Sequence, residues 1–457
     1  AGIFTVSNAN FGAGSYDVRD VRDFYDGVRP DAGEPRADST WTEFYLKPEL
    51  RFKQDVAGGE IFGALSAVYA QTIGDGDGYY VSLTRGNPGS IDLEEAYIGY
   101  KKFLPSDSVQ QSVAVQLGAQ NFWLGDGFLV QLARLNLGEY SGYYLTPRTA
   151  FSGFGTVRVN TSPVRADFFL LETPVDNERT YGDADFPLDQ PRTRFAGFDV
   201  EWFENAAHEG ANGAEFYWDR KRYLNFTYLN VVDADSSPLY SDIGQYWSRR
   251  DGLHVLSASA GGALFPTSFL DLRENGRLYG QYVRQLNYSD SRRVDAEAFY
   301  IEPAYTFPKL PWSPQIYYRY SRFSGQSGDP ADQSATTTSY DPLFLGGGVR
   351  DLFGNFTAGE VMGVYNTASS NLRTHQVSLK LTAPFHILSD ADSLSVQLIG
   401  FDLSYDKPRQ VGATSRSFAR ELDLAIQYNV DHQTIVAFAM GVASPGNGGR
   451  EAMAANV

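Results

Sequence analysis

The chain has 457 residues, and 38 Lys and Arg against 55 Asp and Glu give it a formal net charge of −17. This acidic balance excludes a protein that binds nucleic acid through clustered basic residues. The chain has no cysteine, which excludes disulfides, thiolate metal sites and cysteine nucleophiles. No apolar run approaches the roughly 18 residues that a spanning helix needs, so a helical membrane protein is excluded as well.

The sequence instead predicts a succession of long strands in which apolar and polar residues alternate. Phe44, Leu46, Leu50 and Phe52, for example, would share one face of a strand, and the polar residues between them would share the other. A first strand is expected before residue 30 and a last one after the loop near 444–450. The strands between them are expected near 42–53, 60–73, 91–102, 112–121, 152–160, 165–174, 193–203, 213–231, 251–261, 277–287, 292–307, 314–325, 372–384, 394–404, 418–429 and 433–443.

The connections between these strands alternate between short and long. Tight turns such as Thr161–Val164 are separated by long polar segments, including 122–151 and 326–371. Strands of about 10 to 12 residues with loops sorted in this way are typical of outer-membrane barrels. The sequence therefore predicts an all-β, antiparallel up-and-down barrel of about 18 strands in the bacterial outer membrane. It is expected to form a single domain over residues 1–457, and the first residues read as the start of a mature chain.

Several short motifs are shared with one known family. Val115–Gly127 places a Gly-Asp-Gly turn after a strand, and Phe151–Val159 would be the next strand. Ser339–Phe344 contains Asp-Pro-Leu-Phe in a long loop, while Glu421–Leu424 and Gly441–Gly446 lie in the last hairpin. In these segments the chain resembles the alginate export family of outer-membrane barrel proteins.

This resemblance implies a monomeric barrel of about 18 strands that passes an anionic polysaccharide. The arginine of the family's Gly-Arg-Gln motif is Ala119 here. The chain also ends at Val457 without the long final strand and terminal aromatic residue of such barrels. We therefore expect the last strand to be incomplete in this chain.

Basic residues on the polar faces of the predicted strands are the candidate lining of the substrate path. Rings of Arg and Lys guide anions, and a guanidinium can hold a carboxylate through two hydrogen bonds. Alternatively, these cations pair with carboxylates such as Glu43, Asp199 and Asp423 and cross-link the wall. The candidate path residues are Lys47, Arg51, Lys53, Arg158, Arg165, Arg194, Arg319 and Lys380.

The long loop near 326–371 is a candidate gate, because its length would let it fold over or into the mouth of the barrel. Its central motif is Tyr340, Asp341, Pro342, Leu343 and Phe344. Removing about residues 340–365 is expected to raise single-channel conductance, and unchanged conductance would reject the gating role.

No pattern of catalytic residues accompanies these features. The chain has only 5 His residues, and it contains no Gly-x-Ser-x-Gly, His-Glu-x-x-His or phosphate-binding loop motif. We therefore expect no enzymatic activity, no cofactor and no metal site.

The main functional prediction is a channel that passes an anionic polysaccharide or oligosaccharide through an electropositive lumen. One alternative is an uptake porin of the same fold for small hydrophilic solutes. Another is a structural or adhesive barrel whose lumen is plugged. The expected partners are outer-membrane lipid, lipopolysaccharide and a periplasmic export protein, with no nucleic acid.

Overall fold

The computed structural model describes residues 1–9, 39–74, 89–105, 111–133, 144–145, 147–161, 163–174, 192–204, 222–234, 250–263, 272–289, 292–328, 336–344, 359–363, 369–431 and 433–455. These residues form a single sheet of 18 strands with short helices at its ends. No helix in these ranges is long and apolar enough to cross a membrane.

The strands follow one another along the chain and confirm the predicted all-β class. The first nine are β1 (Gly2–Ala9), β2 (Ser39–Leu46), β3 (Glu49–Val56), β4 (Gly59–Gly74), β5 (Gly89–Leu104), β6 (Gln111–Ala119), β7 (Ser152–Asn160), β8 (Val164–Glu172) and β9 (Thr193–Phe203). The others are β10 (Arg222–Ala234), β11 (His254–Gly262), β12 (Gly276–Ser289), β13 (Arg292–Thr306), β14 (Gln315–Phe323), β15 (Leu372–Thr382), β16 (Ser393–Tyr405), β17 (Ser417–Asn429) and β18 (Ile435–Pro445). The helical segments are α4 (Leu272–Asn275), the π-helix η4 (Gly359–Gly363), the 3-10 helix η5 (Pro408–Val411) and α5 (Asn447–Ala455).

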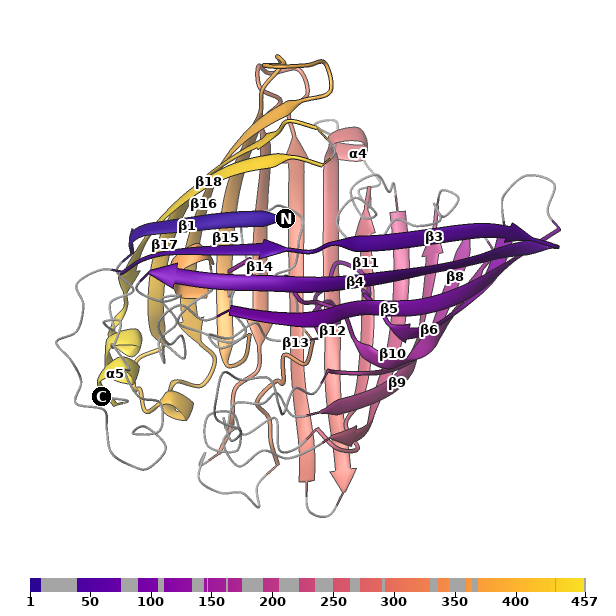
Figure 1. The fold of residues 1–457 in the computed structure, drawn as a ribbon. Coiled ribbons are helices and arrows are strands. Elements are labelled where there is room, and N and C mark those ends of the chain that lie inside the picture. The colour runs from indigo at the N-terminus through magenta and orange to yellow at the C-terminus, as the bar shows by residue number, and fades with distance from the viewer. Residues whose placement is uncertain are drawn as a thin grey trace.

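The sheet has the predicted antiparallel, up-and-down topology. β1 pairs with β2, and β2 and β3 pair with different halves of β4. From β4 to β18, each strand pairs with the next along the chain. The sheet curls round, so that β4 and β5 pass in front of the upright β12 and β13 (Figure 1).

Two predicted strands differ from the structure, and a third is described only in part. The strand expected over 42–53 is two strands, because Pro48 has no N–H to donate to a ladder and interrupts it between β2 and β3. The strand expected over 213–231 is β10, which begins at Arg222, and 213–221 lies outside the described residues. After residue 446 the described chain forms the helix α5 instead of a last strand.

Alternation along each strand places apolar residues on the outside of the curled sheet and polar residues on the inside. On β10, the outward Leu224 and Phe226 are 59% and 44% exposed. The inward Asn225 and Thr227 are buried, and their side chains donate hydrogen bonds of 2.7 and 2.6 Å to Asp199 of β9. This arrangement is the reverse of a soluble sandwich and is typical of a barrel in lipid.

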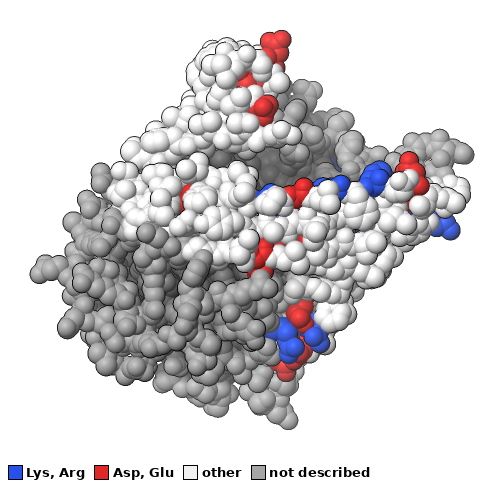
Figure 2. All heavy atoms as spheres, in the orientation of Figure 1, with Lys and Arg blue, Asp and Glu red and all other residues white. Residues whose placement is uncertain are grey.

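The two ends of the sheet differ in their connections. We call the end that bears connections 120–151, 173–192, 235–253 and 324–371 the loop end, and the end that bears turns such as 57–58 and 161–163 the turn end. The predicted sorting has exceptions. At the loop end β12 ends at Ser289 and β13 already begins at Arg292, whereas at the turn end β9 ends at Phe203 and β10 begins only at Arg222. The front strands present a largely uncharged outer face, and charged atoms lie in a row along the edge near β3 (Figure 2).

Candidate functional site: a constricted lumen

The inner face of the sheet changes character along its length. On β10, the inward residues run from Asn225 and Thr227 to Leu229 and Val231 as the strand approaches the loop end. On β15, the inward-facing residues begin at the loop end with the apolar Leu372 and continue toward the turn end with the polar Thr374, Gln376 and Ser378. The loop end of the lumen is therefore apolar, and the middle and turn end are polar.

The apolar part of the wall is covered by a segment of the β6–β7 connection that folds inward. Phe128 is fully buried, and its ring lies 5.1 Å from that of Tyr300 and 5.5 Å from that of Phe323. The carboxylate of Asp126 accepts hydrogen bonds from the Phe128 N–H (3.2 Å) and the Tyr300 hydroxyl (2.5 Å). We call residues 122–133 the first inward segment. The sequence prediction placed it in an external loop, although its run Phe128-Leu129-Val130 is too apolar for one.

The predicted gating motif forms a second inward segment, residues 337–344. Tyr340 and Phe344 are at most 2% exposed. Asp341 is held by Arg250 in a two-pronged ion pair, with Nε–Oδ2 and Nη2–Oδ1 distances of 2.6 and 2.7 Å. The side chain of Gln285 on β12 donates to the Asp341 carbonyl at 2.7 Å and accepts from the Asp341 N–H at 2.9 Å. The motif is therefore anchored inside the lumen, with Leu343 buried beside it and Pro342 half-buried.

The two inward segments join each other. The N–H groups of Gln131 and Leu132 donate to the Phe344 carbonyl at 2.8 and 3.0 Å. The Phe344 ring stacks on Phe195 of β9 at 4.4 Å and meets Phe151 edge-on at 5.4 Å. Together they form a constriction that narrows the lumen near its loop end.

The predicted path cations face the lumen with one exception, but most are paired with carboxylates. Arg165 Nη2 lies 2.9 Å from Glu201, and Arg319 Nε lies 2.5 Å from Glu302. The other pairs are Lys47 with Glu94 and Glu95, Arg51 with Glu49 and Glu95, Lys53 with Glu60, and Arg158 with Asp167, while Lys380 faces the lumen between Gln315 and Gln397. This geometry favours the cross-linked wall over a uniformly electropositive lumen.

The prediction that Arg194 lines the lumen is wrong. Its neighbours Thr193 and Phe195 are the buried, inward residues of β9, so Arg194 points outward. Its Nε donates to Glu172 at 2.8 Å, and its guanidinium lies 4.8 Å from the Phe154 ring centre. The alternation set by Phe195 and Glu201 could have shown this orientation.

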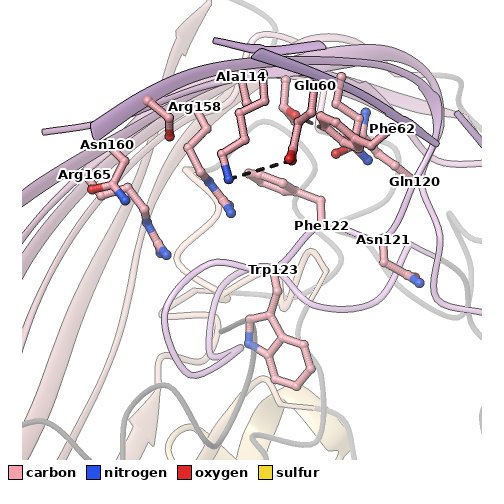
Figure 3. A pocket seen from close by; sticks show the side chains of 14 residues that line it. Glu60, Phe62, Ala114, Gln120, Asn121, Phe122, Trp123, Arg158, Asn160 and Arg165 are labelled. Carbon is pink, nitrogen blue, oxygen red and sulfur yellow. Dashed lines mark hydrogen bonds and ion pairs between the residues drawn. The ribbon is translucent and has the colours of Figure 1, made fainter. Parts of the chain in front are cut away.

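A cavity of about 210 Å³ lies between the first inward segment and the wall of β4 to β8. Arg158 and Arg165 extend from the strands toward it, and Phe122 lies beneath the sheet with Trp123 farther from it (Figure 3). The charged residues of the lining are three cations and one carboxylate. Asp167 and Glu201, which pair with Arg158 and Arg165, are not among the lining residues. The lining residues are Glu60, Phe62, Lys101, Ser112, Ala114, Gln116, Gln120, Asn121, Phe122, Trp123, Thr156, Arg158, Asn160 and Arg165.

Arg158 and Arg165 are predicted path residues, but the sequence prediction names none of the other residues that line this cavity. Lys101 falls on a regular alternation and could have been included. Phe122 and Trp123 could not, because they follow β6 in a connection whose direction no local pattern fixes.

A separate acidic cluster holds η4 against β17. Glu421 accepts the N–H groups of Val361 and Met362 at 2.6 and 2.7 Å, and Asp423 accepts that of Glu360 at 3.1 Å. The Tyr144 hydroxyl donates to Glu360 at 2.6 Å. Burial and the nearby Glu360 carboxylate raise the pKa of Tyr144 well above its ordinary value, which keeps this donor protonated. Within the described ranges, no three His, Asp or Glu side chains converge as a metal site would require.

No protein-family model matches the chain, and no curated protein matches it. Solved structures of porins are similar in outline. Pseudomonas aeruginosa OccK2, crystallised with glucuronate, is 10% identical over 89% of this chain and 86% of its own, with a TM-score of 0.47. A BenF-like porin from Pseudomonas fluorescens Pf-5 is 12% identical over 91% and 88%, with a TM-score of 0.46. P. aeruginosa OccK7 is 14% identical over 89% of both chains, with a TM-score of 0.44. Likenesses of this extent assign neither family nor function, and the alginate-export resemblance stays a prediction.

Proposed function

We propose that this chain is an outer-membrane channel for small hydrophilic solutes, and that it favours a solute with one ring and one carboxylate. The outward apolar rows and inward polar rows of the sheet support a barrel that spans lipid. The long connections at the loop end would face outside, as in other outer-membrane barrels.

The observation that carries this proposal is the small cavity beneath the first inward segment. Its volume of about 210 Å³ is below the roughly 300–1,000 Å³ of pockets for drug-sized ligands. Such a space fits a single ring better than a polymer chain. Arg158, Arg165 and Lys101 supply charge-assisted donors for a carboxylate, and Phe122 and Trp123 supply flat apolar surface for a ring.

The joined inward segments also favour a small solute over a polysaccharide. Phe344 connects the two segments through backbone hydrogen bonds and ring contacts. A polymer that threads through the lumen would have to keep these contacts open during its whole passage. A single-ring solute would open them only once, for a short time. The small-solute alternative therefore fits the geometry better than polysaccharide export.

Solute entry into proteoliposomes tests the proposal. Glucuronate, the ligand of OccK2, is a suitable probe, with uncharged glucose for comparison. Wild-type protein should admit glucuronate faster than glucose. Arg158→Gln should lower glucuronate entry about tenfold, because a hydrogen bond to a charged group contributes about 1.5–3 kcal/mol, and should leave glucose entry unchanged.

The matched control is Arg222→Gln, an exposed arginine on the outer face of β10 at the turn end. It should leave entry of both solutes at wild-type rates. Equal entry of glucuronate and glucose into wild-type vesicles would contradict the proposed preference, as would an Arg158→Gln protein that behaves like wild type.

A further inference from the structure

The outer face of the sheet becomes charged near the loop end. On β15, Val377 is exposed and apolar, and the same face continues toward the loop end with His375 and Arg373. On β17, the exposed Leu422 is followed toward the loop end by Arg420. The cations on this part of the described strands are all arginines: Arg194, Arg284, Arg293, Arg322, Arg373 and Arg420.

Three of these arginines belong to a continuous row of ion pairs across β12 to β16. Arg284 Nη1 lies 3.4 Å from Glu297, and Arg322 Nη1 lies 2.7 Å from the same carboxylate. Arg322 and Arg373 then share Asp406, with Nε–Oδ1 distances of 3.1 and 2.7 Å. We call Arg284, Arg322 and Arg373 the arginine row.

The arginine row presents guanidinium groups outward and keeps its central carboxylate beneath them. The Asp406 side chain is 0% exposed, whereas those of Arg322 and Arg373 are 25% and 31% exposed. Desolvation acts to raise the pKa of Asp406, but hydrogen bonds from Arg322, the Gly325 N–H and Arg373 outweigh it and lower the pKa. The carboxylate therefore stays charged and fixes both guanidinium groups in place.

An arginine that already holds a carboxylate can bind a second anion. A guanidinium carries five N–H donors in a rigid plane, and its geometry matches a phosphate through two parallel hydrogen bonds. Arg420 on β17 lies level with His375, two residues from Arg373 along β15. With strands about 4.8 Å apart and about 3.4 Å per residue, the Cα atoms of Arg373 and Arg420 are about 12 Å apart. A headgroup with two phosphates can reach both.

The position of these arginines matches the level of lipid headgroups. A charged side chain on the lipid face of a barrel costs about 2–4 kcal/mol at the midplane and about 0–1 kcal/mol near the interface. Next to the arginine row, the outward Tyr282, Tyr318 and Tyr320 form the aromatic girdle expected at that level. Beyond them the outer face is apolar, as at Ile316 and Leu398.

We propose that the arginine row, with Arg420, docks the phosphate groups of lipid A in the leaflet that surrounds the loop end. This inference rests on the proposed function only in that the chain spans an outer membrane. Channel activity is not needed for it, so a lipid-binding test and a solute-entry test can fail separately.

Native mass spectrometry of the refolded protein in detergent tests the inference. The probes are lipid A with two phosphates, lipid A with both phosphates removed, and inorganic phosphate alone. Wild-type protein should retain the phosphorylated lipid at least fivefold better than the dephosphorylated one. Arg322→Gln/Arg373→Gln should reduce that retention by more than about tenfold, because each basic residue near a charged lipid surface contributes about 1 kcal/mol.

Two further variants separate phosphate recognition from folding. Arg420→Gln removes a side chain that is 82% exposed, so it should leave the barrel folded and reduce retention about fivefold. Arg222→Gln, on the same outer face at the turn end, should retain lipid A like wild type. Equal retention of the phosphorylated and dephosphorylated lipids would overturn the inference, as would wild-type retention by Arg420→Gln in a folded protein. Tight binding of inorganic phosphate with no preference between the lipids would also overturn it.

Discussion

At the scale of single residues, the constriction depends on charged groups that are buried with specific partners. Arg250 and Asp341 are 1% and 4% exposed and face each other through two short contacts. Removing one member of such a pair leaves an uncompensated charge in a place that water does not reach. Replacing both members by apolar residues avoids that penalty.

Arg250→Met should therefore release the second inward segment from the wall. The expected loss is about 3–5 kcal/mol of local stability, visible as faster proteolysis near residues 337–344 and a higher single-channel conductance. The double variant Arg250→Met/Asp341→Leu should recover most of the protease resistance. If the single variant is as resistant as wild type, this ion pair does not anchor the segment.

At the turn end, the connection between β15 and β16 depends on the negative charge of Asp392. Desolvation acts to raise its pKa, but the Leu388 N–H, the Tyr428 hydroxyl and the N–H groups of Ser389 and Ile387 outweigh it and hold the pKa well below its ordinary value. A carboxyl whose pKa is lower in the folded state stabilises that state above its unfolded pKa of about 3.9. This contribution is lost as the pH falls from there through the depressed folded value.

Hydrogen exchange at Ile387, Leu388 and Ser389 should therefore accelerate as the pH falls below about 4, once corrected for intrinsic rates. In Asp392→Asn the exchange should be fast already at neutral pH and show no such transition. A pH transition that persists in Asp392→Asn would assign it to another group.

At the scale of elements, the constriction consists of two connections that pack against the sheet and against each other. Phe344 is the residue at which they meet, through the Gln131 and Leu132 N–H groups and the ring of Phe195. This contact joins a segment that follows β6 to one that follows β14. The width of the lumen is therefore set by packing between two loops.

Phe344→Ala should widen the constriction. Truncating a buried phenylalanine costs about 3–5 kcal/mol of stability. Loss of this ring should also let the two segments move apart, so single-channel conductance should rise. The control is Phe168→Ala, which truncates an outward phenylalanine that is 49% exposed and should leave the conductance unchanged. Removing residues 340–365 should raise the conductance further.

The elements show why the strands could be predicted from the sequence and the constriction could not. Alternation over long strands fixes which face of each strand is apolar, so most strands and the inward orientation of most predicted path cations follow from the sequence, while their role in a path stays a prediction. Arg194 is the exception, because the alternation that makes Phe195 and Glu201 inward residues points it outward.

The inward folding of loops depends on contacts that are distant in sequence. Asp126 meets Tyr300 and Arg250 meets Asp341, and neither partner can be inferred from its local pattern. The sequence marks the motif at 340–344 as a candidate gate, but it does not reveal the anchoring residues Arg250 and Gln285. The helix α5 likewise lies where the sequence analysis expects a last strand.

At the scale of the whole molecule, the lumen has two parts with different chemistry. Its loop end is filled by apolar side chains and the two inward segments, and its turn end keeps a polar wall with the positively lined cavity. Tyr144 connects the first strand to the last strands of the sheet, since its ring stacks on Phe4 of β1 at 4.0 Å and its hydroxyl donates to Glu360 of η4, which packs against β17 and β18.

The most direct test of this account is planar-bilayer recording of the refolded protein. We expect discrete conductance steps that glucuronate blocks in a concentration-dependent manner and glucose does not block. The steps should become larger in Phe344→Ala. An absence of steps would indicate a plugged barrel and contradict the channel. Steps that a uronic-acid polymer blocks but glucuronate does not would contradict the small-solute passage and return the polysaccharide exporter as the better explanation.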